Sequence, residues 1–210
     1  MRCIVIGSKE LSCVILDELI RQNHTVPLVI SRDDSSGMKV WHEMGHRSLK
    51  DTALQQGIDV LEGANVNDND TLAAIREAKP DLILSCFWSD LFGSELLSIP
   101  PRGVFNFHTA YLPRNRGSRP IPWAMIKGDE FAGITLHKML VGVDDGPMVA
   151  QRKIRIGVND TGKSLYDKVM GLGSELVEEV VEVFGAGKEV LTPQDEIEST
   201  FQLRGEPHGG

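Results

Sequence analysis

Two polar side chains close an apolar segment in the middle of the chain. In the segment GVFNFH at 103–108, Asn106 and His108 stand two positions apart. Alternate side chains of a strand point to one face, so this pair shares a face while Phe105 and Phe107 share the other. An amide can donate to a developing oxyanion, and an imidazole titrates near neutral pH. The segment therefore predicts a strand that presents groups for acyl or proton transfer.

The residues after this strand extend the pattern as far as Gly146. They include Leu112-Pro113, Arg116-Gly117, Pro120, Trp123, the segment GITLH at 133–137 and the turn-rich segment GVDDGP at 142–147. Each piece alone also fits an ordinary structural role: Asn106 as a structural amide, His137 as a residue packed on a sheet surface and Asp144 as part of a plain turn. Their occurrence together and in this order is what indicates a functional site.

A second pattern, GVNDTGKS at 157–164, matches the phosphate-binding motif G-x-x-x-x-G-K-S. Its backbone N–H groups would cradle a phosphate, and Lys163 would neutralise it. The same residues also suit a helix start capped by Asp160 or Thr161. We favour the cap, because only one helix and a tail follow and no later strand can supply a Mg²⁺-binding Asp. A nucleotide-binding protein that uses Gly157–Ser164 remains the alternative from another functional class.

A third pattern is HEMGH at 42–46, a match to the zinc motif H-E-x-x-H. On a helix, His42 and His46 would face one metal ion and Glu43 would act as base. Gly45 weakens any helix by about 1 kcal/mol relative to Ala, and no third ligand stands out downstream. We favour a surface loop for this segment and expect no metal at the functional site.

Strand and helix patterns alternate through the first half of the chain. Strands are predicted at 2–6, 26–30, 59–61, 81–85 and 103–108, with helices around 11–19, at 49–56 and from Asp70 or Thr71 to Ala78. This alternation predicts an α/β fold, a Rossmann-like doubly wound and mostly parallel sheet with helices on both faces. Ligands of such sheets bind beyond the carboxyl ends of the strands, where Asn106 and His108 would lie.

The second half has a different pattern. Strands are predicted at 131–139 and 149–156, and an amphipathic helix at 164–184, where apolar residues recur at helical spacing. The chain becomes polar from about Thr192. We expect one domain over residues 1–190, followed at 191–210 by a polar C-terminal tail or the start of an extension.

Composition narrows the functional classes. The 210 residues carry a formal net charge of -8, which disfavours non-specific binding to nucleic acid. No apolar run approaches the ~20 residues of a membrane span, so we expect no membrane partner. The three cysteines are an odd number without C-x-x-C spacing, which predicts reduced thiols and a cytoplasmic protein.

The run from Asn106 to Gly146 resembles the catalytic domain of the folate-dependent formyltransferases. That family shows the pattern N-x-H-x-S-L-L-P, then R-G, then a G-[VI]-T-[LIV] strand and a D-x-G turn. The resemblance is specific over 103–150 and extends more loosely over 1–185. Two positions depart from it: Ala110 replaces the usual Ser, and Ser89 stands where an Arg or similar residue is usual.

The resemblance implies roles for particular residues. Asn106, His108 and Asp144 match the catalytic Asn, His and Asp of the family. The formyl donor is expected to be 10-formyltetrahydrofolate, bound by two loops. The expected cofactor-binding residues are Phe87, Trp88, Ser89, Leu91, Leu140, Val141 and Val143.

The acceptor is expected to be a small primary amine. Arg114, Arg116 and Gly117 are the expected substrate-binding residues, because a basic segment beside the catalytic strand suits the phosphate of a sugar nucleotide. We therefore favour a nucleotide-linked amino sugar. Hydroxyornithine, methionyl-tRNA and glycinamide ribonucleotide are the alternatives, and tRNA is disfavoured because no RNA-binding domain is expected in this chain. Whether the chain forms a homodimer stays open.

Overall fold

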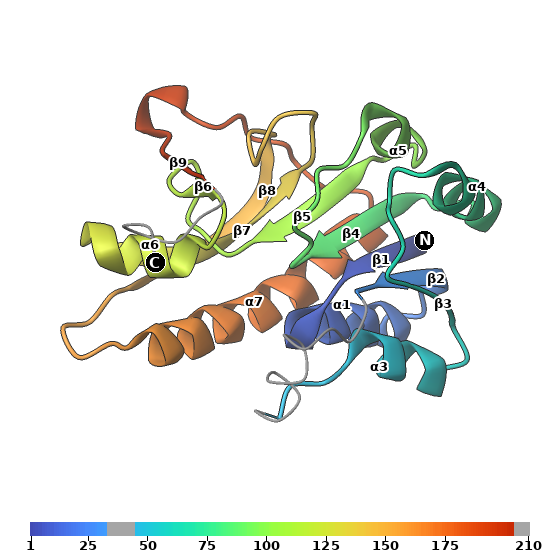
Figure 1. The fold of residues 1–210 in the computed structure, drawn as a ribbon, viewed down its shortest axis with the longest axis horizontal. Coiled ribbons are helices and arrows are strands. Elements are labelled where there is room, and N and C mark those ends of the chain that lie inside the picture. Colours follow the sequence, from blue (N-terminus) through green and yellow to red (C-terminus); the bar gives the residue numbers. More distant parts are fainter. Residues whose placement is uncertain (33–44, 204–210) are drawn as a thin grey trace.

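A computed structural model of the chain describes residues 1–32 and 45–203 (Figure 1). The strands are β1 (Arg2–Gly7), β2 (Thr25–Ser31), β3 (Asp59–Glu62), β4 (Leu82–Cys86), β5 (Val104–His108), β6 (Arg116–Gly117), β7 (Phe131–Lys138), β8 (Met148–Arg155) and β9 (Phe201–Gln202). The helices are α1 (Lys9–Arg21), α3 (Leu49–Gln55), α4 (Asn69–Ala78), α5 (Ser94–Ser98), α6 (Pro120–Lys127) and α7 (Gly162–Gly185), with a 3-10 turn at Glu196–Glu198.

Seven strands form the main sheet in the order β3-β2-β1-β4-β5-β7-β8. The pairs from β3 to β5 are parallel, whereas β7 is antiparallel to both β5 and β8. The strand order changes direction between β1 and β4, which is where ligands of doubly wound sheets bind. The predicted Rossmann-like, mostly parallel α/β fold is therefore confirmed.

Alternate residues of the strands pack into two separate hydrophobic cores, one on each face of the sheet. In β1, Cys3 and Val5 join a core with α1 and α7, while Ile4 and Ile6 join a second core with α4 and α5. Figure 1 shows α1 and α7 below the sheet and α4 and α5 on the other side. Phe105 and Phe107 are buried in the first core, as their alternation in the sequence predicts. The three cysteines are buried free thiols.

Two local predictions need correction. Helix α4 begins at Asn69 because Asp68, rather than Asp70 or Thr71, accepts a hydrogen bond from the N–H of Thr71 at 2.9 Å. Helix α6 was not predicted, because Pro120 and the nearby proline indicate a loop. Both prolines lie in the first turn of the helix, where a missing N–H costs nothing.

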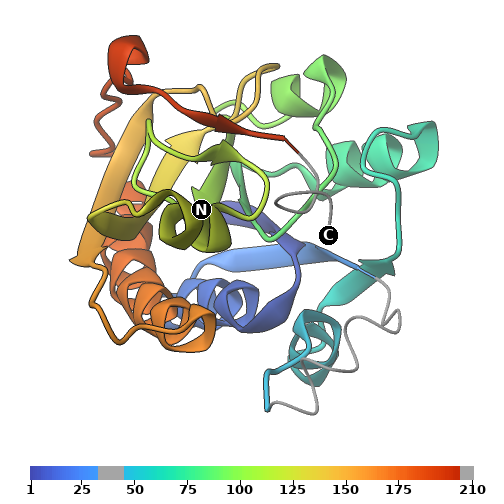
Figure 2. The same ribbon diagram turned by 60° about the vertical axis from the view of Figure 1, so that its left-hand side comes forward.

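The segment after α7 folds back onto the loop that follows β5. Thr192 and Met148 exchange two backbone hydrogen bonds of 2.8 Å, and β9 pairs in parallel with β6. Figure 2 shows this segment, in red, crossing the face that carries the β6 loop. No helix in the part of the chain that the structure describes is both long and apolar enough to cross a membrane.

Candidate active site

A cavity of about 980 Å³ opens at the carboxyl ends of β4 and β5. Its walls come from the loop after β4, the end of β5, the loop after β6, the turn between β7 and β8, and the start of α7. Asn106, His108 and Asp144 all line it. The cavity therefore lies where the sheet topology predicts a ligand, and it brings together three residues that are distant in sequence.

Asn106 is placed by the antiparallel pairing of β5 with β7. It stands opposite His137 in the register, and Nδ2 of the amide lies 3.5 Å from Nε2 of the imidazole. The strand exposes one face of the amide to the cavity and holds the other against His137. An amide fixed in this way can donate to an anionic oxygen in the cavity without first reorganising.

His108 is buried at the end of β5 and contacts two oxygens. Its Nε2 lies 2.9 Å from the carbonyl oxygen of Asn115, and its Nδ1 lies 3.5 Å from Oδ2 of Asp144. A carbonyl only accepts, so the hydrogen bond to Asn115 places a proton on Nε2. Nδ1 is then the nitrogen that can gain or release a proton, and it does so beside a carboxylate.

Asp144 sits in a tight turn with φ of +51°, a left-handed conformation that Asp tolerates better than most residues. The turn depends on Gly146, because a Cβ there would collide with the carbonyl oxygen of Lys138. In this position the carboxylate accepts a hydrogen bond of 2.8 Å from the N–H of Gly117, and its Oδ1 lies 3.3 Å from Nε2 of His137.

The surroundings keep the Asp144 carboxylate ionised. Burial by itself raises the pKa of this carboxyl, but the positive charge available on His108 and His137 and the N–H of Gly117 outweigh that effect. The net result is a pKa well below the ordinary value of 3.8. Asp144 is therefore an anion between two imidazoles, able to stabilise a proton on either.

The seven residues expected to bind the cofactor all line the same cavity. They are Phe87, Trp88, Ser89, Leu91, Leu140, Val141 and Val143. Most are apolar, and they come from the loop after β4 and the turn between β7 and β8. Among the described residues, the buried Nε1 of Trp88 and the buried Oγ of Ser85 lack a hydrogen-bond partner. A polar ligand in the cavity could satisfy both.

The three residues expected to bind substrate do not lie in one site. Gly117 lines the cavity and holds Asp144. The guanidinium of Arg116 instead binds the carboxylate of Glu196 and the amide oxygen of Gln194, at 2.7–3.1 Å. Arg114 borders a different pocket beside α6. The phosphate role predicted for these two arginines is therefore not favoured by where their side chains lie.

The G-x-x-x-x-G-K-S segment forms a helix cap, as favoured from the sequence. Thr161 is the N-cap of α7, and it exchanges hydrogen bonds with Ser164. The carboxylate of Asp160 accepts from the N–H of Gly157 at 2.7 Å and from Lys168 Nζ at 2.7 Å. These contacts, that of Lys168 above all, lower the pKa of Asp160 to about 2. The N–H of the motif's first glycine thus already donates to a carboxylate, and Lys163, the motif's lysine, pairs with Asp167 at 2.6 Å.

In the HEMGH segment, His42, Glu43 and Met44 lie outside the described residues. His46 is described, and it borders the cavity with its ring centroid 6.1 Å from that of Tyr166. The favoured surface loop and the disfavoured zinc site on this segment therefore both stay untested predictions.

Sequence reasoning missed two residues that contact the predicted catalytic groups. His137 was expected to pack on a sheet surface, but it is 1% exposed and faces Asp144. Asn115 was not singled out, although its carbonyl accepts from His108. The register of β5 against β7 and the course of the loop after β5 decide both contacts. The only sequence signal was that His137 lies in the same run as the catalytic residues.

Comparisons with known proteins give the family and the relatives of this chain. The family model described as Formyl transferase matches residues 1–181. A methionyl-tRNA formyltransferase from Agathobacter rectalis is 32% identical over 200 residues, which are 95% of this chain and 64% of that protein. The chain thus spans slightly less than two thirds of the length of that curated relative.

Two solved structures show the same fold. An N-formyltransferase from Helicobacter canadensis superposes with a TM-score of 0.81 at 22% identity, over 96% of this chain and 70% of that one. A glycinamide ribonucleotide transformylase from Symbiobacterium toebii gives a TM-score of 0.75 at 24% identity, over 93% and 94%. Because the family model covers most of the sequence, including every predicted catalytic residue, this chain belongs to the formyl transferase family.

Proposed function

We propose that this chain transfers a formyl group from 10-formyltetrahydrofolate to a primary amine. The observation that carries the proposal is the convergence of an amide, an imidazole and an ionised carboxylate on one cavity of about 980 Å³. In a family of formyl transferases, these are the groups that acyl transfer between two nitrogens requires.

The proposed reaction passes through a tetrahedral intermediate. The neutral amine attacks the formyl carbon, a new C–N bond forms, and the carbonyl π electrons move onto oxygen. Collapse of that oxyanion breaks the bond from the formyl carbon to N10 of the folate. The amine nitrogen loses one proton and N10 gains one, so the reaction needs a donor for the oxyanion and a site that exchanges a proton.

The chain supplies both requirements. Asn106 Nδ2–H can donate to the oxyanion, and removal of a donor of this kind typically costs roughly 10²–10³ in rate. His108 carries a proton on Nε2, bonded to Asn115, and exchanges a second proton at Nδ1. Asp144 stabilises the protonated form through its charge at 3.5 Å. The proton can therefore rest on His108 between leaving the amine and reaching N10.

The donor is proposed to bind between the loop after β4 and the turn after β7. Phe87, Trp88 and Leu91 on one side, with Leu140 and Val141 on the other, offer apolar surface to a planar pterin ring. The unpaired Nε1–H of Trp88 is a candidate donor to that ring. The neighbour from Helicobacter canadensis was crystallised with folinic acid, a related folate.

For the acceptor we propose a nucleotide-linked amino sugar. Lys9 and Arg119 line the cavity and are cationic groups that a phosphate could approach, a role first expected of Arg114 and Arg116. Lys163 also lines it, but its ammonium group already pairs with Asp167 at 2.6 Å. The structure from Helicobacter canadensis holds dTDP-3-aminofucose. The second candidate is methionyl-tRNA, favoured by the curated relative from Agathobacter rectalis, although a net charge of -8 gives little help in binding RNA.

A panel of amines tests this proposal. The protein is incubated with 10-formyltetrahydrofolate and, separately, a dTDP-amino sugar, hydroxyornithine, glycinamide ribonucleotide or methionyl-tRNA, and products are analysed by mass spectrometry. We expect the dTDP-amino sugar to gain one formyl group and His108→Ala to abolish the gain. If methionyl-tRNA alone were formylated, the proposed acceptor would be wrong and the proposed formyl transfer would be supported. Tight folate binding with no formylated product, or with release of formate only, would overturn the transferase assignment.

A further inference from the structure

One backbone carbonyl of the loop between β5 and β6 accepts a hydrogen bond from the imidazole of His108. Asn115 is 4% exposed, and its carbonyl oxygen is the acceptor for Nε2 of His108 at 2.9 Å. We propose that Asn115 is a positioning residue for His108, held in place by Asp129 and by the C-terminal segment around Thr200. This inference rests on the catalytic role proposed for His108.

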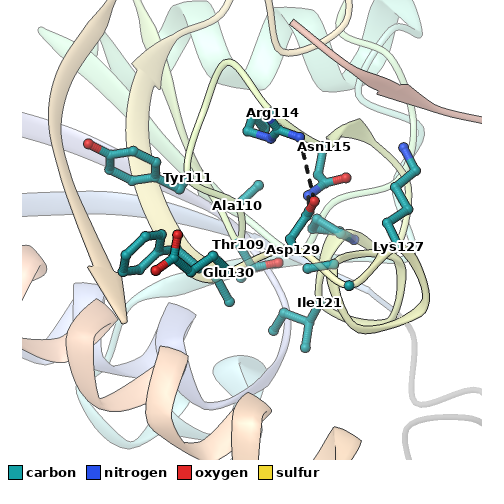
Figure 3. A pocket seen from close by; sticks show the side chains of 14 residues that line it. Thr109, Ala110, Tyr111, Arg114, Asn115, Ile121, Lys127, Asp129 and Glu130 are labelled. Atoms are coloured by element: carbon teal, nitrogen blue, oxygen red, sulfur yellow. Dashed lines mark hydrogen bonds and ion pairs between the residues drawn. The ribbon is translucent and has the colours of Figure 1, made fainter. Parts of the chain in front are cut away.

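Asn115 adopts a left-handed backbone conformation and is hydrogen-bonded on two sides. Its φ is +59°, which Asn tolerates better than most non-glycine residues. The side-chain Nδ2 donates to Oδ2 of Asp129 at 2.6 Å, and the backbone N–H donates to Oγ1 of Thr200 at 2.8 Å. Figure 3 shows Asn115 and Asp129 pointing toward one another at the edge of the pocket beside α6, where Arg114 also faces Asp129. The orientation of the Asn115 carbonyl is thus fixed from two sides.

The C-terminal segment fixes the loop over several residues. The N–H of Arg116 donates to the carbonyl of Thr200 at 2.9 Å, and the N–H of Ser118 donates to the carbonyl of Gln202 at 3.1 Å. In return, the N–H of Thr200 donates to the carbonyl of Pro113 at 3.2 Å. At Gly117, whose φ is +91°, a Cβ would collide with the carbonyl of Gln202. The two segments therefore fit together only with glycine at this position.

Side chains add to this attachment. The buried guanidinium of Arg116 binds Glu196 and Gln194, and Gln194 Nε2 in turn donates to the carbonyl of Asp144 at 2.8 Å. Residues 191–203 thus contact the loops that carry both partners of His108. They lie outside the region that the family model matches, which ends at residue 181.

The consequence for His108 concerns which nitrogen carries the proton. While the Asn115 carbonyl stays in place, the neutral imidazole keeps its proton on Nε2, and Nδ1 is available beside Asp144. If the carbonyl moves away, the proton can shift to Nδ1 and the ring can turn. Nδ1 would then be unable to accept a proton, so turnover would fall although the folate walls of the cavity are unchanged.

Thr200 offers the sharpest test, because valine has the same shape but no hydroxyl. We expect Thr200→Val to lower kcat about tenfold, the size expected when a buried N–H loses its acceptor, with an unchanged KM for the folate. Thr200→Ser keeps the hydroxyl and should restore kcat. Ser199→Ala is the matched control, since the hydrogen bond described for the Ser199 hydroxyl lies within its own turn, to the carbonyl of Glu196 at 2.9 Å.

Asp129 offers a second test from the other side of the loop. Asp129→Asn retains an oxygen that can accept from Asn115, whereas Asp129→Ala does not. We expect the alanine variant to lower kcat about as much as Thr200→Val, by about tenfold, and the asparagine variant to stay close to wild type. Thermal unfolding of each variant shows whether it is folded before its kinetics are compared.

NMR of ¹⁵N-histidine-labelled protein gives a readout that needs no acceptor amine. The His108 signals, assigned by their loss in His108→Ala, should show a proton on Nε2 in wild type and a mixture of tautomers in Thr200→Val. Unchanged tautomer and unchanged kcat in folded Thr200→Val and Asp129→Ala would overturn this inference alone. Full activity in His108→Ala would instead overturn the proposed role of His108.

Discussion

Oδ1 of Asp144 lies 3.3 Å from Nε2 of His137, while Oδ2 of the same carboxylate lies 3.5 Å from Nδ1 of His108. The two imidazoles have equivalent arrangements, because each directs its other nitrogen to a backbone carbonyl. His108 uses that of Asn115 at 2.9 Å, and His137 uses that of Lys138 at 3.1 Å. One buried carboxylate therefore faces two groups that can each hold a proton.

The contact between His137 and Asp144 predicts the effect of replacing His137. In His137→Gln, Asp144 loses one of its two potentially cationic neighbours, and Asn106 loses the ring that supports its amide. We expect kcat to fall about ten- to one-hundredfold, since hydrogen bonds to charged groups are worth roughly 1.5–3 kcal/mol. Steady-state kinetics with the best acceptor amine will measure this. An unchanged kcat would show that His137 only fills space.

Replacing Asp144 by Asn should change how stability depends on pH. The pKa of Asp144 is lower in the folded protein than the ordinary 3.8, so its ionised form stabilises the fold. That contribution is fully present above pH 3.8 and is lost as pH falls below it toward the folded pKa. We expect the urea midpoint of Asp144→Asn to fall less steeply with acid over that range than that of wild type. Parallel curves would contradict this account.

Replacing Asn106 should separate catalysis from donor binding. Asn106→Ala removes the donor to the oxyanion, and we expect kcat to drop roughly 10²–10³-fold. The dissociation constant of folinic acid should change far less, because apolar walls supply most of its proposed binding surface. Isothermal titration and steady-state kinetics on one preparation can compare the two effects. Asn159→Ala, at an exposed amide, serves as the control.

Because Thr161 caps α7, replacing it should lower the stability of the fold. It should not change the binding of a nucleotide. Thr161→Ala removes the side-chain acceptor for the N–H of Ser164, at 3.1 Å, and should cost about 1 kcal/mol of unfolding free energy. Thr161→Ser should retain most of that stability. Urea denaturation will measure both. A nucleoside triphosphate that stabilises wild type but not Lys163→Ala would instead support the phosphate-loop alternative.

The sequence by itself determined the sheet and pointed to the residues for which we propose catalytic roles. Apolar runs separated by helical patterns predicted the parallel strands, because alternation and helical spacing are local properties that survive in any tertiary context. Asn106 and His108 could be paired from the sequence alone, since a separation of two places both side chains on one face of a strand. The roles proposed for Asp144 and for the two loops expected to bind folate came from a resemblance that is carried by an ordered series of short motifs.

Only the tertiary structure decided what surrounds those residues. His137 reaches Asp144 through the register of two antiparallel strands, and register depends on side-chain packing between segments rather than on local sequence. The sequence made Arg116 a candidate phosphate ligand, but its guanidinium binds Glu196, because the C-terminal segment folds back onto the β6 loop. Contacts between residues far apart in the chain leave no periodic pattern, so the support of His108 by Asn115 and Thr200 became visible only in three dimensions.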